Sequence, residues 1–176
     1  MPRDWDARYS DPANVDYTPA PLLVEVAEML SPGHALDLAC GPGRHALYLA
    51  SLGWRVTAVD SSAIAIQLLR DRAAGLNVDA HRADLERGEF AVAANAYDLI
   101  CDFYYLQRDL FPRIREGVRP GGVFVGAIHL AGERPGRFQL QPGELRDEFA
   151  GWKILFYSEA PGPPARPAAR IIARRA

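Results

Sequence analysis

The sequence has 176 residues, of which 49% are hydrophobic and 10% aromatic, so it is long enough for one domain with its own core and is unlike a disordered segment. Its formal net charge of −2 gives no overall field that would attract nucleic acid or an anionic membrane. No apolar run approaches the roughly 18 residues that a membrane-spanning helix needs, and the opening MPRDWDARYS contains no apolar signal segment. We therefore expect a soluble, cytoplasmic protein.

The chain opens with a polar, aromatic and proline-punctuated segment. We expect an irregular arm over residues 1–20, with one helical turn at 5–9, and then a helix that opens at Thr18 and Pro19. The helix has an apolar stripe of Leu22, Leu23, Val26, Ala27 and Leu30. The arm contains three aromatic residues, Trp5, Tyr9 and Tyr17. They would either form a lid over a site or hold the arm against the domain.

Beyond the arm, strand-like apolar runs alternate with helix-like runs. Strands are expected at 35–40, 55–60, 77–84, 97–103 and 123–130. Helices are expected at 44–53, at 63–75 with a cap from Ser61 or Ser62 and an end at Gly75, and at 106–118 with a break or kink at Pro112. The motif RPGG at 119–122 is expected to be a turn. Such alternation predicts a parallel sheet with helices on both faces.

The C-terminal part departs from this alternation. A short helix at 142–151 precedes a strand at 152–159 and a last strand-like run at 170–175, and only a proline-rich loop separates the two strands. Strands joined in this way should pair antiparallel. The sequence therefore predicts a mostly parallel, seven-stranded α/β sheet that ends in an antiparallel hairpin.

Four expected strand ends carry glycines or acids. Gly41 and Gly43 follow the first strand, Asp60 ends the second, Asp84 follows the third and Asp102 lies at the end of the fourth. Gly41 can adopt a positive φ, and Gly43 omits a side chain where a ligand would need contact. Each residue alone has a plainer interpretation, as a tight turn, a helix cap or a turn residue. Ligands of parallel sheets bind at the carboxyl ends of the strands, so the convergence of these residues on one rim favours a binding site.

The segment LDLACGPGRHALYLASLGWRVTAVDSS resembles the cofactor-binding core of class I S-adenosylmethionine-dependent methyltransferases. It is similar to their acidic-x-Gly-x-Gly-x-Gly motif, at Asp37, Ala39, Gly41 and Gly43, with Ala39 in place of the first glycine. The similarity continues through RADL, YDLICDFYYL and RPGGVFV, over residues 30–130. The strings WDARY and FQLQPGEL resemble a small-molecule branch that includes tellurite-resistance and thiopurine-type methyltransferases.

This resemblance implies a Rossmann-like fold and a set of cofactor-binding residues. It implies one domain over 1–176, with the arm or lid at 1–20, a cofactor-binding core at 21–130 and a substrate-side helix and hairpin at 131–176. The implied contacts to S-adenosylmethionine are Asp37, Ala39, Gly41, Gly43, Arg44, His45, Asp60, Ser61, Ser62, Asp84, Leu85, Asp102 and Phe103. Asp60 would bind the ribose hydroxyls, and Asp84 would contact the adenine.

A nicotinamide oxidoreductase of minimal size is the alternative enzyme. Gly41, Gly43 and Ala46 nearly match the Gly-x-Gly-x-x-Gly/Ala fingerprint of dinucleotide folds. Asp37, however, would place a carboxylate close to a pyrophosphate, which is unfavourable. A methyl donor carries an ammonium and a sulfonium instead, so Asp37 and Asp102 favour it. A cofactor-binding module without catalysis stays open as a third interpretation.

We accordingly expect methyl transfer to a small molecule such as a thiol or a chalcogen oxyanion, with S-adenosylhomocysteine as the product. The substrate-facing candidates are Tyr9, Tyr104, Tyr105 and His129, and no catalytic base is assigned. The fourth strand lacks the Asn/Asp-Pro-Pro-Tyr/Phe signature of DNA-methylating relatives, which argues with the charge against a nucleic-acid substrate. Cys40 and Cys101 lack ligand-spaced partners, so no metal is expected. We expect a monomer or homodimer without membrane partners.

Overall fold

The computed structural model describes residues 4–132, 136–160 and 166–176. The chain forms two compact units, Met1–Ala91 and Val92–Ala176. The boundary falls inside the core expected over 21–130, and the single-domain organisation stays a prediction. Parts of the expected arm and of the proline-rich loop lie outside the described residues.

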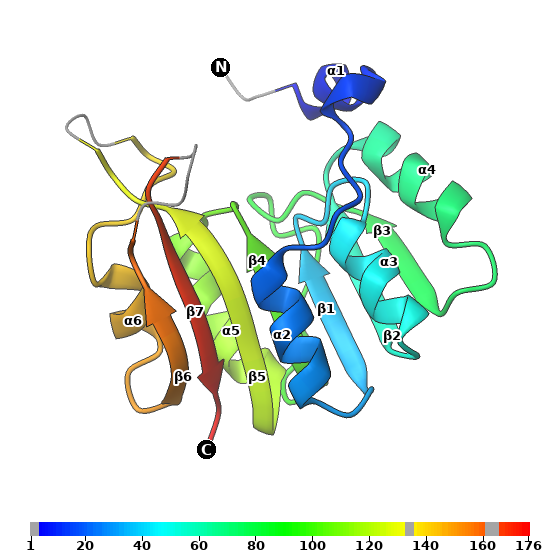
Figure 1. Ribbon diagram of the computed structural model, residues 1–176. Helices are drawn as coiled ribbons and strands as arrows, with labels where there is room; N and C mark the ends of the chain where they lie inside the picture. The colour runs from blue at the N-terminus through cyan, green and yellow to red at the C-terminus, as the bar shows by residue number, and fades with distance from the viewer. Residues whose placement is uncertain (1–3, 133–135, 161–165) are drawn as a thin grey trace. The chain divides into compact units, whose positions relative to one another are not determined.

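The first unit is a parallel α/β arrangement with strand order β3-β2-β1 (Figure 1). Its strands are β1 (His34–Leu38), β2 (Arg55–Asp60) and β3 (Val78–Arg82). Its helices are α1 (Trp5–Tyr9), the 3-10 turn η1 (Pro12–Asn14), α2 (Pro21–Met29), α3 (Arg44–Ser51) and α4 (Ala63–Arg72). Helix α3 packs on β1 and β2, and α4 packs on β2 and β3, so each helix covers the strands that it connects.

Local chemistry explains where the helices of this unit begin. Helix α2 begins at Pro21 and not at Thr18 or Pro19, because Pro21 takes the first helical position, where its missing N–H is not needed. Helix α4 is capped as expected by Ser62, whose side chain accepts from the backbone N–H of Ala65 at 3.1 Å. It ends at Arg72, three residues before the expected end at Gly75.

The second unit has strand order β4-β5-β7-β6. Its strands are β4 (Tyr97–Phe103), β5 (Val118–His129), β6 (Lys153–Ser158) and β7 (Ala168–Arg174). Its helices are the 3-10 turn η2 (Arg108–Leu110), α5 (Phe111–Gly117) and α6 (Glu144–Glu148). Strand β4 pairs parallel with β5, whereas β7 pairs antiparallel with both β5 and β6. The predicted antiparallel C-terminal hairpin is thereby confirmed.

Two expectations for the second unit are wrong in detail. The RPGG motif is not a turn that precedes a strand, because β5 already begins at Val118 and passes through it as an irregular bulge against β4. The backbone of Gly121 and Gly122 pairs with Arg175, which holds the motif in the sheet. Pro112 does not kink a long helix either, because it lies in the first turn of α5, where proline is tolerated.

The described residues thus contain the seven strands of the predicted mostly parallel α/β fold. Cys40 and Cys101 are both buried, as expected. Trp54, Phe111, Phe124 and Phe149 are among the largest fully buried side chains. Within the described ranges, no helix combines the length and the apolar character needed to cross a membrane.

Candidate functional site

The loop between β1 and α3 is built on left-handed backbone conformations. Ala39, Gly41 and Gly43 have φ values of 50°, 54° and 88°. The amide of Gly43 donates to the carbonyl of Cys40 at 3.0 Å, and the amide of Cys40 donates to the carbonyl of Val59 at 3.0 Å. These bonds turn the chain sharply at the end of β1.

Asp60, at the end of β2, holds this loop by its carboxylate. Oδ2 accepts from the amide of Gly41 at 2.8 Å, and Oδ1 accepts from the amide of Ser62 at 2.8 Å. Burial raises the pKa of Asp60 above its ordinary value, while the two amide bonds oppose the rise. Each carboxylate oxygen has a further lone pair, so Asp60 can still accept hydrogen bonds from ligand hydroxyls.

Asp37 and His45 form a second buried polar pair behind the loop. Asp37 Oδ2 accepts from the amide of Ala46 at 3.1 Å, and its Oδ1 lies 4.0 Å from Nδ1 of His45. His45 Nε2 accepts from the amide of Ala20 at 3.3 Å. Burial, followed by the positive charge of Arg44, lowers the pKa of His45 to about 3, so the ring is neutral at ordinary pH. The pair therefore ties β1, α3 and the start of α2 together.

The arm residue Tyr9 covers the glycine turn. A Cβ atom built on Gly41 would lie 2.7 Å from the hydroxyl oxygen of Tyr9. Burial, and then the nearby charge of Asp60, raises the pKa of Tyr9 to about 12. Tyr9 also stacks on Trp5, with ring centroids 6.2 Å apart. The structure thus brings this substrate-facing candidate onto the glycine turn.

Asp6 is a polar residue of this region that the sequence did not single out. Its Oδ1 accepts from the hydroxyl of Ser62 at 2.5 Å and from the amide of Ile64 at 3.2 Å. Fifty-six residues separate Asp6 from Ser62. No local spacing could have revealed a pair so distant in sequence, and only the fold brings it together.

The remaining candidates of the first unit have mainly local contacts. Asp84 Oδ1 accepts from the amide of Glu86 at 2.9 Å, which is the turn role that the plainer interpretation gave it. Leu85 is buried and Ser61 is exposed. Arg44 lies 3.7 Å from Asp16 as an ion pair. The contacts of these residues to a cofactor stay predictions.

The space beside Gly43 is filled by packing. A Cβ atom at Gly43 would lie 2.2 Å from Cδ1 of Leu69 on α4. Gly43 therefore allows Leu69 of α4 to pack against the glycine turn, a role that differs from the ligand contact expected for it.

In the second unit, the predicted residues cluster at the ends of β4 and β5. Asp102 and Phe103 are buried at the end of β4. Tyr104 follows with a φ of 68°, and its amide donates to the carbonyl of Ala127 at 2.6 Å. The residue is 48% exposed, and its ring stacks on His129 with a centroid distance of 4.8 Å and an interplanar angle of 30°. A non-glycine residue held in this conformation indicates a functional constraint.

Tyr105 differs from its neighbour Tyr104. Its hydroxyl donates to Oε1 of Gln107 at 2.7 Å, and the residue is half-buried. Of the two tyrosines, Tyr104 is therefore the more exposed ring.

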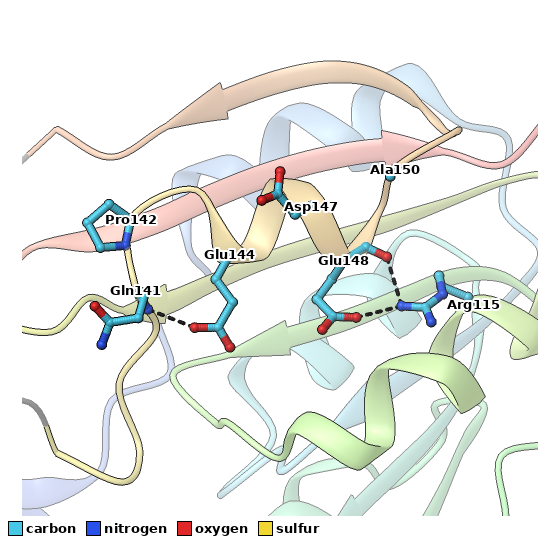
Figure 2. Close-up of a pocket in the computed structure, with 7 residues that line it drawn as sticks. All are labelled: Arg115, Gln141, Pro142, Glu144, Asp147, Glu148 and Ala150. Carbon is cyan, nitrogen blue, oxygen red and sulfur yellow. Dashed lines mark hydrogen bonds and ion pairs between the residues drawn. The ribbon is translucent and has the colours of Figure 1, made fainter.

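A cavity of about 660 Å³ also lies in the second unit (Figure 2). It is lined by Arg115, Gln141, Pro142, Glu144, Asp147, Glu148 and Ala150. Arg115 pairs with Glu148 at 2.7 Å, and Glu144 accepts from the amide of Gln141 at 2.8 Å. None of these residues belongs to the predicted site. Among the residues that the structure describes, no group of three or more His, Cys, Asp or Glu side chains is arranged to hold a metal ion.

The parallel strands, the glycine turn after β1 and the acid at the end of β2 define the fold of class I S-adenosylmethionine-dependent methyltransferases. The crystal structure of TehB from Haemophilus influenzae superposes with a TM-score of 0.81 at 24% identity, over 98% of this chain and 66% of that one. A family model described as tellurite resistance protein TehB matches residues 7–167. The chain therefore belongs to the TehB family.

Two curated relatives are similar to most of this chain. The chain is 35% identical to hemagglutinin 1 of Eikenella corrodens over 78% of its own length and 50% of that protein. It is 30% identical to a probable S-adenosyl-L-methionine-dependent methyltransferase TehB of Haemophilus influenzae, over 80% of this chain and 53% of that protein. The chain thus spans about half the length of the curated relatives it matches.

Proposed function

We propose that this protein is an S-adenosylmethionine-dependent methyltransferase that acts on a small-molecule acceptor. The observation that carries the proposal is the buried Asp60 carboxylate, bonded at 2.8 Å to the amide of Gly41 in the glycine turn. Family membership supports it, as does the name of the Haemophilus influenzae relative.

The residues of the turn fit a positively charged cofactor with hydroxyl groups. Asp37 and Asp60 are both buried and provide negative charge around the turn. The free lone pairs of Asp60 can accept the two hydroxyl protons of a ribose. Asp60 would suit a ribose of either cofactor, but a pyrophosphate at the turn would meet the Asp37 carboxylate unfavourably. The negative charge of the buried carboxylates therefore favours S-adenosylmethionine over a dinucleotide.

When bound, S-adenosylmethionine supplies a methyl group already activated by its sulfonium, so the protein mainly has to position the reactants and exclude water. Tyr9 covers the turn and keeps its proton, because its pKa is raised to about 12. It can therefore donate a hydrogen bond but is a poor base near neutral pH. A soft acceptor such as a thiolate or a chalcogen oxyanion needs little help from a base.

In this proposal, Tyr104 and His129 contact the molecule that receives the methyl group. Tyr105 is the less exposed alternative. The Tyr104 ring is half-exposed and is held against His129 by its strained backbone. This aromatic pair offers one flat face and one imidazole to a small molecule. Asp102 and Phe103 remain proposed cofactor contacts of the second unit, and no metal is proposed.

Ligand binding tests which cofactor the protein binds. S-adenosylhomocysteine should raise the melting temperature of the wild type, whereas a nicotinamide dinucleotide should not. Asp60→Ala should weaken S-adenosylhomocysteine binding about 10- to 100-fold, because it removes a charged acceptor of hydrogen bonds. Glu25→Gln, which removes an exposed charge on α2, is the matched control and should bind like the wild type. Stabilisation by the dinucleotide alone would overturn the proposal.

Turnover needs a separate test. A panel of thiols, chalcogen oxyanions, amines and phenols, incubated with methyl-labelled S-adenosylmethionine, should give a labelled product for at least one soft acceptor. Tyr104→Ala should raise KM for that acceptor and leave S-adenosylhomocysteine binding intact. Binding of the cofactor without transfer to any member of the panel would favour a non-catalytic binding module.

A further inference from the structure

We propose that Asp6 is a positioning residue that fastens α1 over the glycine turn and thereby controls the entry and release of the cofactor. The inference rests on the proposed function, in which this turn binds S-adenosylmethionine. Helix α1 spans only Trp5–Tyr9, and a helix of five residues is not stable on its own. Its place must therefore be fixed by contacts with the rest of the first unit.

Asp6 makes its contacts at the start of α4. Its Oδ1 accepts from the hydroxyl of Ser62 at 2.5 Å and from the amide of Ile64 at 3.2 Å. The amide of Ile64 is one of the N–H groups at the beginning of a helix that have no partner within that helix. The carboxylate also lies at the positive end of the helix dipole of α4. Asp6 thus satisfies a donor of α4 while it attaches α1 there.

The same contacts connect Asp6 to the proposed cofactor acid. Ser62 donates its hydroxyl to Asp6, and its amide donates to Oδ1 of Asp60 at 2.8 Å. Asp60 Oδ2 in turn accepts from the amide of Gly41 at 2.8 Å. One continuous series of hydrogen bonds therefore runs from the arm through Ser62 and Asp60 to the glycine turn.

The other end of α1 lies on the turn itself. Tyr9 follows Asp6 by three residues, so both side chains lie on the same face of α1. Tyr9 places its hydroxyl 2.7 Å from the position that a Cβ atom of Gly41 would take. Fastening Asp6 to α4 therefore holds Tyr9 over the turn, and releasing Asp6 would let Tyr9 move away from it.

This arrangement predicts a kinetic signature. With α1 fastened, a ligand of the turn can enter and leave only when the arm opens. Asp6→Ala should therefore increase both the association and the dissociation rate constants of S-adenosylhomocysteine. Dissociation should increase more, because the cover from Tyr9 is also lost, so Kd should rise about fivefold. A loss of folded protein would instead lower the amplitude of the binding signal and leave both rate constants unchanged.

The experiment compares the wild type, Asp6→Ala, Asp6→Asn and Glu28→Gln by stopped-flow binding of S-adenosylhomocysteine. Asp6→Asn should lie between the wild type and Asp6→Ala, because an amide oxygen can still accept both bonds without the charge. Glu28→Gln removes an exposed charge on α2 and should behave like the wild type. Unchanged rate constants in Asp6→Ala would overturn the proposal.

Hydrogen exchange without ligand gives a second readout that does not depend on the proposed function. In Asp6→Ala, the amides of residues 4–10 should exchange faster, while those of β2 should stay as protected as in the wild type. Unchanged exchange at 4–10, or a loss of protection that extends through β2, would overturn the role of Asp6 in fastening α1. If the wild type does not bind S-adenosylhomocysteine, the proposed function fails, and this exchange comparison still decides whether Asp6 fastens the arm.

Discussion

At the scale of single residues, the glycine turn contains one side chain in a costly conformation. Ala39 stands where the family motif has its first glycine, and it adopts a φ of 50°. The left-handed conformation costs an L-residue other than glycine about 1–2 kcal/mol, because Cβ crowds the following carbonyl. The backbone geometry that the motif requires is therefore retained at the expense of stability.

Replacing Ala39 by glycine should relieve this strain. Glycine also gives the unfolded chain more freedom, which offsets about 0.4–1 kcal/mol of the gain. We expect Ala39→Gly to raise the free energy of unfolding by up to about 1 kcal/mol, measured by urea denaturation. Ala50→Gly, in the last turn of helix α3, is the control and should lower stability by up to about 1 kcal/mol. A decrease for Ala39→Gly as well would show that Ala39 is not strained.

At the scale of elements, the sequence predicts best where the pattern is local. The bounds of β2 and β4 agree with the expected 55–60 and 97–103, because each is a compact apolar run that ends in charged or turn residues. The sequence also predicts a serine cap before α4 but leaves it between Ser61 and Ser62, and the structure shows that Ser62 is the cap. The path of residues 119–122 could not be predicted, because glycine and proline normally favour a turn. The backbone of the distant Arg175 pairs with Gly121 and Gly122 and holds them in β5.

For the candidate site, sequence spacing could indicate the glycine turn and the acid at the end of β2. It could not indicate the contacts that join distant segments. Two such contacts are the packing of Tyr9 over Gly41 and the hydrogen bond between Asp6 and Ser62. Both require the N-terminal arm to fold back onto the rest of the first unit. The close packing of Gly43 against Leu69 was likewise hidden, because a glycine in a motif looks the same whether it admits a ligand or a neighbouring side chain.

The packing of Leu69 on α4 against the glycine turn predicts the effect of a substitution at Gly43. Gly43→Ala combines a φ of 88° with a Cβ that would lie 2.2 Å from Leu69, so we expect a loss of about 3 kcal/mol in the free energy of unfolding. Gly53→Ala is the matched control, because Gly53 has a φ of 90° and no atom within 4 Å of its added Cβ. It should lose only the conformational part, about 1–2 kcal/mol. Equal losses in urea denaturation would argue against the packing role.

At the scale of the whole molecule, the first unit buries several ionisable groups. Asp37, His45 and Asp60 are all buried there. Such groups lower stability unless they are bonded, and here the amides of Gly41, Ser62, Ala46 and Ala20 provide the bonds. The stability of the protein should therefore depend on pH through groups that lie beside the proposed site.

His45 determines the direction in which stability changes with pH. Its pKa is lowered from 6.5 to about 3 on folding, so below pH 6.5 the unfolded chain takes up a proton that the folded protein does not. The free energy of unfolding should therefore be highest well above pH 6.5. Because of His45, it should fall by about 2 kcal/mol between pH 7 and pH 5. His45→Gln keeps an acceptor for the amide of Ala20 but does not titrate, so urea denaturation should show a flatter pH profile. Parallel profiles for the two proteins would mean that His45 is not held neutral by burial.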